Sequence, residues 1–390
     1  MTNRTRFAIL AVTAPILAFT LVGGLLGRAS ANEDTYRYLA IFEEVVSLVT
    51  DNYVEQVEPE RIMEGALWGL AEALDPESSY LTPREVELFD EGTGIHTDNI
   101  GLVLTRRYYI QVVAPRDGSP ADVSGLKPGD FLREIDGQPT RTMSTVRAYE
   151  LLNGPAGSTS SISVIRNNAA EPISLELTRN NTKSRSISSR FVGPGVGYLR
   201  IAEFDDTATE SIASATEQLA GQGAQNLLID LRNTASGTFK AGMAAAELFT
   251  PADTLLIRES SDSQEPVIRM GPKSSISWPI VLITNPGTAG AAELFAAVLT
   301  DTTTAESVGT RTAGRAAEQT LVNLPDGGGL LLSSSHYLTA SGTSIHRTGI
   351  EPAIAVQEPT IELTQTPVVP MEDPLLDRAL ERVLQMTTQL

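Results

Sequence analysis

The sequence predicts an α+β protein of several domains, with an N-terminal helical unit, a small partly open β-barrel and an α/β core. Apolar residues recur at helical spacing near the N-terminus, and short alternating strands with turns follow them. Continuous apolar strands then alternate with helices. The segments we expect are 1–31, 32–95, 96–180, 190–356 and, after a Pro-rich connector, a C-terminal helix within 357–390.

Composition excludes several kinds of site. The formal net charge is −19, and neutralising phosphates requires a basic surface, so we expect no nucleic-acid partner. The chain has no cysteine, which excludes disulfides, thiolate metal sites and a cysteine nucleophile. Its three histidines, His96, His336 and His346, lack the spacing of a helical zinc motif. We therefore expect neither a metal nor another cofactor.

The N-terminal segment 1–31 is typical of an export signal. Two arginines precede the apolar run 7–26, and an Ala-Ser-Ala cleavage pattern follows at 29–31. A run of this length can also span a bilayer, so an uncleaved membrane anchor is the alternative. In both cases we expect the rest of the chain to be exported, in the periplasm or another extracytoplasmic space, either free or anchored to the inner membrane.

Helical patterns flank the two inner domains. Apolar residues recur at helical spacing in 38–53 and again in 63–74, which predicts two amphipathic helices. Near the C-terminus, Asp373 in the N-cap position and Pro374 in the first helical position predict a further helix.

The two inner domains differ in their strand patterns. Short alternating strands and turns fill 99–179, which is typical of a small barrel. The stretches "NLLIDLRN" at 226–233 and "PIVLITN" at 279–285 are continuous apolar strands, each followed by a turn and a helix. Such strands predict a parallel sheet with crossover connections.

The stretch "GSPADVSGLKPGDFLREIDGQP" at 118–139 closely resembles PDZ domains of bacterial exported proteases. The resemblance implies that "NIGLVL" at 99–104 receives the C-terminal carboxylate of a peptide, which adds as a strand to the sheet edge. The peptide-binding residues it implies are Asn99, Ile100, Gly101, Leu102 and Val103. A glycine at 101 suits this task, because a residue without Cβ lets backbone donors approach an anion closely.

From residue 39 to residue 356 the order of segments resembles the carboxyl-terminal processing peptidases, also called tail-specific serine peptidases. The helical segment and the PDZ stretch are followed by "GVGYLRIAEF" at 195–204, "LLIDLRN" at 227–233 and "HYLTASGTSIHRTGIEPAIAV" at 336–356. The resemblance implies a PDZ domain that docks the C-terminal tails of exported proteins. It also implies a peptidase core related in fold to the crotonase and Clp-type proteins.

The family cuts peptides with a serine nucleophile and a lysine base. In this sequence the serine turn is "TAGAAE" at 288–293, and the nucleophile position falls on Gly290. The lysine segment is "GTRTAGR" at 309–315, so the base position falls on Arg315, and Gln319 matches a glutamine that orients the lysine. Glycine has no side-chain oxygen, and arginine keeps its proton at physiological pH. The chain is therefore identified as a catalytically degenerate member of the family.

A relocated nucleophile is the alternative. Ser236 and Lys240 lie four residues apart where a strand leads into a helix, and a shared helix face would bring them together. Thr288 offers a hydroxyl two residues before Gly290, although we interpret it as a turn residue that caps the following helix.

The sequence is therefore compatible with two functions. The first is an exported pseudopeptidase that binds C-terminal tails as a scaffold or regulator, in a hetero-oligomer with an active relative. The second is an active serine-type endopeptidase that cleaves the C-terminal regions of exported proteins with a relocated nucleophile.

Overall fold

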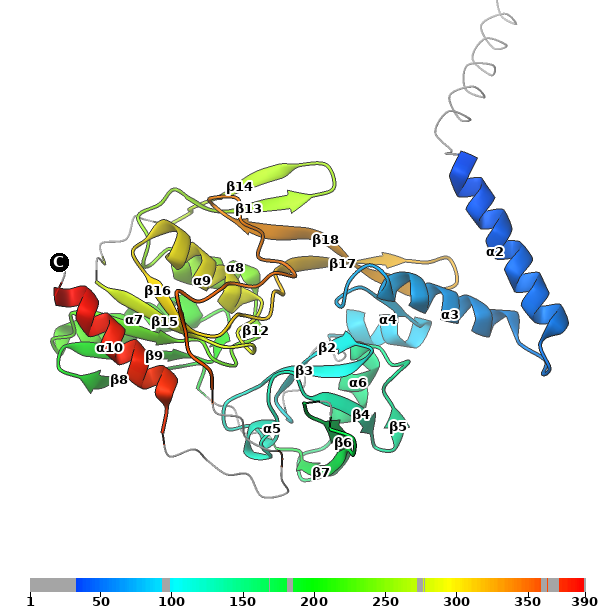
Figure 1. The fold of residues 1–390 in the computed structure, drawn as a ribbon, viewed down its shortest axis with the longest axis horizontal. Helices are drawn as coiled ribbons and strands as arrows, with labels where there is room; N and C mark the ends of the chain where they lie inside the picture. The colour runs from blue at the N-terminus through cyan, green and yellow to red at the C-terminus, as the bar shows by residue number, and fades with distance from the viewer. Residues whose placement is uncertain are drawn as a thin grey trace, which may run out of the picture. The chain divides into compact units, whose positions relative to one another are not determined.

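The structure is a computed structural model, and it describes residues 33–92, 99–167, 169–180, 185–271, 276, 278–358, 363 and 372–388 (Figure 1). The chain divides into two compact units, Met1–Leu70 and Ala71–Leu390. The expected export signal, His96, Lys183 and Lys273 lie outside the described residues. Within the described ranges, no helix is both long enough and apolar enough to cross a membrane.

The first unit is helical, as its periodicity predicts. α2 spans Glu33–Asn52 and α3 spans Pro59–Glu72. Much of their apolar surface is exposed. The exposed large apolar residues on or beside these helices are Tyr36, Tyr38, Leu39, Ile41, Phe42, Val45, Leu48, Val49, Tyr53, Val54, Met63 and Leu70. We call this set the apolar helical surface.

The residues after α3 form a turn, a short strand and a short helix. The Asp75 carboxylate accepts hydrogen bonds from the backbone N–H groups of Glu77 and Ser78, at 2.9 and 2.7 Å, which fixes the turn that carries Glu77. β1 (Ser79–Leu81) and α4 (Pro83–Asp90) follow, and a capping box begins α4.

Residues 99–180 form a small β-domain. Its strand order is β2-β3-β4-β6-β7, with β5 paired to β4, so β2 is an edge strand among the strands that the structure describes. The strands are β2 (Leu102–Arg107), β3 (Tyr109–Pro115), β4 (Phe131–Ile135), β5 (Gln138–Pro139), β6 (Thr159–Ile165) and β7 (Ile173–Thr178). The helices are α5 (Pro120–Val123) and α6 (Thr145–Leu152), each begun by a serine N-cap.

The second domain is an α/β core built on a six-stranded sheet of order β19-β16-β15-β11-β9-β8. Its strands are β8 (Ile187–Gly193), β9 (Val196–Ile201), β11 (Asn226–Asp230), β15 (Ile280–Thr284), β16 (Glu306–Gly309) and β19 (Ile354–Ala355). All neighbours pair in parallel except β8 with β9. The prediction of a parallel sheet from the two continuous apolar strands is confirmed.

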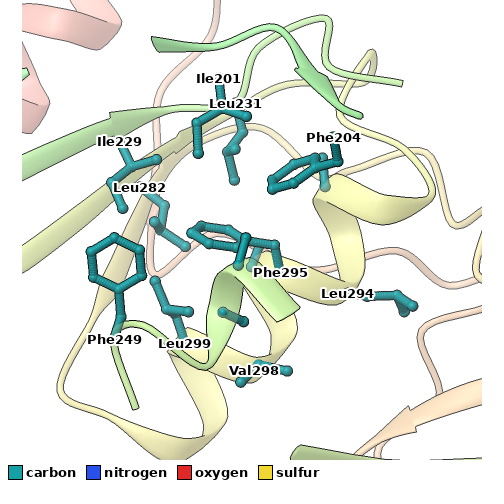
Figure 2. Close-up of a cluster of buried hydrophobic side chains, with 14 of the residues drawn as sticks. Ile201, Phe204, Ile229, Leu231, Phe249, Leu282, Leu294, Phe295, Val298 and Leu299 are labelled. Atoms are coloured by element: carbon teal, nitrogen blue, oxygen red, sulfur yellow. The ribbon is translucent and has the colours of Figure 1, made fainter. Parts of the chain in front are cut away.

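Helices cover both faces of this sheet. α7 (Ala208–Gly221), α8 (Phe239–Ala246) and α9 (Ala291–Thr302) share one buried cluster with alternate strand residues, and α10 (Pro374–Thr388) shares the other. Figure 2 shows Phe295 of α9 at the centre of the first cluster, with ring centroids 5.3 Å from Phe204 and 5.9 Å from Phe249. The rigid packing of α9 matters for function, because the turn before α9 carries Gly290.

The same unit contains a second sheet, whose strand pairs are all antiparallel. Its order is β1-β18-β13-β14, with β17 also paired to β18, and a parallel pair joins β10 and β12 separately. These strands are β10 (Glu203–Phe204), β12 (Ser236–Gly237), β13 (Thr254–Ser260), β14 (Gln264–Ile268), β17 (Ala317–Asn323) and β18 (Gly329–Thr339).

The C-terminal part returns to both domains. Asp373 accepts a hydrogen bond from the backbone N–H of Leu376 at 3.1 Å, so its predicted role as the cap of α10 is confirmed. Arg232 binds the same carboxylate with two hydrogen bonds of 2.9 Å. Leu363, by contrast, is 7% exposed and belongs to the buried cluster of the β-domain.

Candidate functional site

The turn between β15 and α9 presents Gly290. Gly290 is the N-cap of α9 and has φ 61° and ψ −119°, a conformation that side-chain-bearing residues rarely adopt. A Cβ built on it would meet Phe239 Cε1 at 3.4 Å and the Arg315 carbonyl oxygen at 3.9 Å, which are ordinary contacts. The turn therefore has room for a side chain directed toward the Arg315 loop, although its backbone is one that strains any residue except glycine.

Arg315 lies across from this turn and is held by an ion pair. Its Nε donates to Glu77 Oε1 at 2.9 Å, and the two side chains are 25% and 9% exposed. Gln319 donates from its amide to the backbone carbonyl of Glu77. Arg315 and Gln319 thus both hold the turn of Glu77, and a guanidinium occupies the position that the resemblance assigns to the base.

Glu293, one turn into α9, fastens the two halves of this site together. It is fully buried and accepts hydrogen bonds from the N–H groups of Gly290, Gly314 and Arg315 at 3.1, 2.7 and 2.7 Å, and from the Thr312 hydroxyl at 2.5 Å. Burial raises the pKa of Glu293, against these hydrogen bonds, which lower it. The Glu293 carboxylate therefore joins the Gly290 turn to the Arg315 loop.

A cavity of about 270 Å³ joins this site to the β-domain. Its wall includes Gly290, Arg315 and Gln319 from the core and Val103, Leu104 and Tyr149 from the β-domain. The structure therefore brings together three core residues that the sequence singles out and one end of the expected peptide-binding strand.

The expected peptide-binding loop has the backbone orientation that anion capture needs. The carbonyls of Ile100 and Gly101 accept from the N–H groups of Ala121 and Arg116 at 3.1 and 2.8 Å. Since O and H point in opposite directions across a trans peptide, the N–H group of Gly101 points away from α5, and that of Leu102 points away from Arg116. Gly101 has φ 74°, and a Cβ on it would lie 2.3 Å from the Cβ of Ser119, so only glycine fits.

The remaining loop residues and Tyr149 complete this edge. Asn99 donates from its amide to the carbonyl of Gly154 at 2.5 Å, which ties the loop to the end of α6. The backbone N–H of Leu104 donates to the Tyr149 hydroxyl at 2.9 Å. Sequence reasoning missed Tyr149, since no local pattern links a helix tyrosine to a strand 45 residues earlier.

The structure corrects two local expectations about the alternative nucleophile residues. Ser236 lies in β12, and α8 begins after its N-cap Thr238, so Ser236 and Lys240 do not share a helix face. Thr288 does not cap α9: its buried hydroxyl donates to the Leu231 carbonyl at 2.8 Å and accepts from the Asn285 N–H at 3.1 Å. Both bonds hold the turn after β15.

The two histidines among the described residues, His336 and His346, lie close together. His336 Nε2 lies 2.7 Å from Glu259 Oε2, and its ring centroid lies 5.9 Å from that of His346. Burial lowers the pKa of His346. Across the described residues, no group of three or more histidine, aspartate or glutamate side chains is arranged to hold a metal ion.

Comparison with known proteins agrees with this architecture. The family model for peptidase family S41 matches residues 195–356, and the PDZ domain model matches residues 111–166. The carboxy-terminal-processing protease of Bartonella bacilliformis is 28% identical over 338 residues, which cover 85% of this chain and 77% of that protein. The carboxy-terminal processing protease CtpA of Bacillus subtilis is 26% identical over 356 residues, covering 90% and 76%.

A solved structure agrees as well. The photosystem II D1 C-terminal processing protease superposes with a TM-score of 0.68 and 25% identity, over 82% of this chain and 92% of that one. That structure thus shares its fold with most of this chain. Residues 195–356 therefore match peptidase family S41 and residues 111–166 match PDZ domains, and over most of its length the chain is similar to carboxy-terminal processing proteases.

Proposed function

We propose that this chain is an exported pseudopeptidase that binds the C-terminal tails of other exported proteins. The observation that carries the proposal is the paired change in an intact frame. Gly290 stands at the nucleophile position and Arg315 at the base position, while Glu293 still joins their two loops. A glycine cannot form an acyl-enzyme, and a guanidinium paired with Glu77 cannot accept a proton.

Tail binding is supported by the geometry of the PDZ loop. Gly101 directs its backbone N–H group away from α5, and β2 is an edge strand among the described strands. A peptide can add there when its main chain replaces the Tyr149 hydroxyl as the partner of the Leu104 N–H group. None of these groups depends on Gly290 or Arg315. Binding can therefore persist without cleavage, and the protein acts as a scaffold or regulator.

Covalent labelling tests the catalytic half of the proposal. The purified full chain is treated with a fluorophosphonate probe and analysed by mass spectrometry, with Thr288→Ala and Ser236→Ala variants in parallel. We expect no stoichiometric adduct and no tail-dependent cleavage. A stoichiometric adduct on any serine or threonine would favour the alternative, an active endopeptidase with a relocated nucleophile. Loss of the adduct in one of the two variants, or mass-spectrometric mapping, would identify the labelled residue.

Titration tests the binding half. Short fluorescent peptides with an apolar last residue are compared as free acids and as C-terminal amides. Loss of charge-assisted hydrogen bonds to the carboxylate weakens binding of the amide by about tenfold or more. Equal affinity for the two forms would contradict carboxylate capture.

We further propose that the chain acts outside the cytoplasm and assembles with an active relative. Segment 1–31 supports export, with an uncleaved anchor as one form, and the apolar helical surface supports assembly because it is large and uncovered within its unit. A reporter that is active only outside the cytoplasm, fused after residue 31, tests export. An inactive fusion contradicts it.

Co-purification with a catalytically intact relative tests assembly. We expect Phe42→Glu to abolish co-purification, and its retention in that variant contradicts the proposed surface.

A further inference from the structure

The ion pair between Arg315 and Glu77 borders two cavities. One has a volume of about 270 Å³ and is lined by Gly290 and Leu104, and the other has about 230 Å³ and is lined by Arg107. Both walls include Arg315 and Glu77. Each volume is several times the roughly 30 Å³ of a water molecule in the liquid, so a ligand side chain can approach this pair.

The ion pair leaves part of the guanidinium available. In the described part of the chain, Nε is the one atom of the Arg315 side chain that donates a hydrogen bond, at 2.9 Å to Glu77. Arg200 in the same chain shows the full arrangement, with Nε and Nη2 each 2.8 Å from the two oxygens of Asp117. A guanidinium prefers such two-pronged binding of a planar carboxylate. The two Nη groups of Arg315 can therefore donate hydrogen bonds to a second carboxylate, either beside that of Glu77 or in its place.

The surroundings strengthen a charged contact at this place. Arg315 is 25% exposed, and Tyr149, Phe239 and Leu104 form apolar parts of the cavity wall. Electrostatic attraction is stronger beside such surfaces than in bulk water. The presence of Glu77 also shows that the geometry already accommodates one carboxylate.

A tail bound to β2 would pass this site. Its terminus lies at Gly101, and the strand continues along β2 past Val103 and Leu104, which line the cavity. At about 3.3 Å per residue, those positions correspond to two or three residues before the terminus. A side chain at that point in the peptide can enter the cavity of Arg315.

We propose that the former catalytic site is a carboxylate-binding site, in which Arg315 receives an aspartate or glutamate side chain two or three residues before the end of a bound tail. Glu77 is the internal competitor for the same guanidinium. This inference rests on the proposed tail binding and names the tails that are preferred: acidic near, and not only at, the C-terminus.

Paired peptides and opposing variants test it. The full chain is titrated with tails that carry glutamate or glutamine at the second or third residue before the terminus, each as free acid and amide. We expect the wild-type chain to prefer glutamate by about tenfold. Arg315→Gln abolishes that preference, whereas Glu77→Gln increases the affinity for the glutamate peptide several-fold, because it removes the competing charge. Arg311→Gln, on the same loop but paired with Glu351, leaves both values unchanged.

The outcomes separate this inference from the function on which it rests. A preference for free acid over amide, without any preference for glutamate, keeps tail binding and overturns the site. Equal weakening of all peptides by Arg315→Gln and Glu77→Gln also overturns it, since that pattern indicates only structural support. Loss of the free-acid preference in Arg315→Gln would assign Arg315 to the terminus instead and contradict the side-chain site. Arg315→Lys keeps the positive charge, so we expect it to retain a reduced preference for glutamate. Thermal denaturation of this variant checks that it is folded. If no tail binds, both proposals fail.

Discussion

Two turns of this protein, one in the PDZ domain and one in the S41 core, each present a glycine with positive φ, and the two glycines have different causes. At Gly101 an added Cβ would lie 2.3 Å from Ser119 Cβ, so the packing itself demands glycine. At Gly290 the nearest atom would be Phe239 Cε1 at 3.4 Å, so the packing leaves room for a side chain. The first glycine is required by the packing of its loop, and the second lies at the position that the family resemblance assigns to a nucleophile.

Under the proposed function, this difference separates a loop that still binds from a turn that no longer reacts. The PDZ loop retains the backbone that carboxylate capture needs. The core turn is joined to the Arg315 loop through Glu293, with glycine and arginine at the two positions that the resemblance assigns to the reaction. Variants that treat the two turns alike should therefore have unlike effects.

The largest difference is expected from one added methyl group. Gly101→Ala combines a left-handed backbone, which costs about 1–2 kcal/mol, with overpacking against Ser119, which costs about 1–3 kcal/mol. We expect the PDZ domain to lose stability by the sum and tail binding to disappear. Gly290→Ala carries only the backbone penalty, about 1–3 kcal/mol. Calorimetry and peptide titration of both variants provide the measurement, and equal losses of tail binding would break the comparison.

Next in size is the buried carboxylate that keeps the core frame. In Glu293→Gln an amide NH₂ replaces an oxygen that accepts one or two N–H groups, and each unsatisfied buried donor costs about 1–3 kcal/mol. The effect depends on pH. Burial raises the pKa of Glu293 above its usual 4.5, so its contribution to stability is complete below pH 4.5 and declines as pH rises through the raised value.

Urea unfolding at a series of pH values measures this dependence. The stability difference between wild type and Glu293→Gln should shrink as pH rises. A difference that grows with pH would show that the hydrogen bonds outweigh burial and that the carboxylate is ionised when buried.

Much of the fold follows from local sequence patterns, and the corrections have local causes. The buried runs at 226–230 and 280–284 predict the parallel sheet because strands covered on both faces need no polar alternation. Sequence spacing misjudged Ser236 and Lys240, because Thr238 begins the helix only after the serine. The contacts of Glu77 with Arg315 and of Tyr149 with Leu104 join distant segments. No periodicity encodes such contacts.

Leu363 also makes a contact between distant segments, because it packs in the buried cluster of the PDZ domain. It is 7% exposed within the PDZ cluster, although it follows the last strand of that domain by well over a hundred residues. Leu363→Ala should destabilise the PDZ domain by about 2 kcal/mol, at the lower end for a buried leucine because its neighbours can relax. Ile268→Ala, at an exposed site, serves as control and should change stability by less than about 0.5 kcal/mol. Equal effects in hydrogen exchange of the PDZ strands would contradict this packing role.

The smallest signal, and the most direct test of the core turn, is a restored reaction. Gly290→Ser has room for its Cβ, and Arg315→Lys supplies an amine that can lose its proton. Glu77 would oppose this, because a carboxylate within a few Å favours the charged ammonium. We therefore expect little fluorophosphonate labelling in the double variant and slow but measurable labelling of the introduced serine in the triple variant that adds Glu77→Gln. The single Gly290→Ser variant is the matched control. Equal labelling with and without Glu77→Gln would show that the Glu77 carboxylate does not control this position, whereas no labelling in any variant would show that the frame has changed along with its side chains.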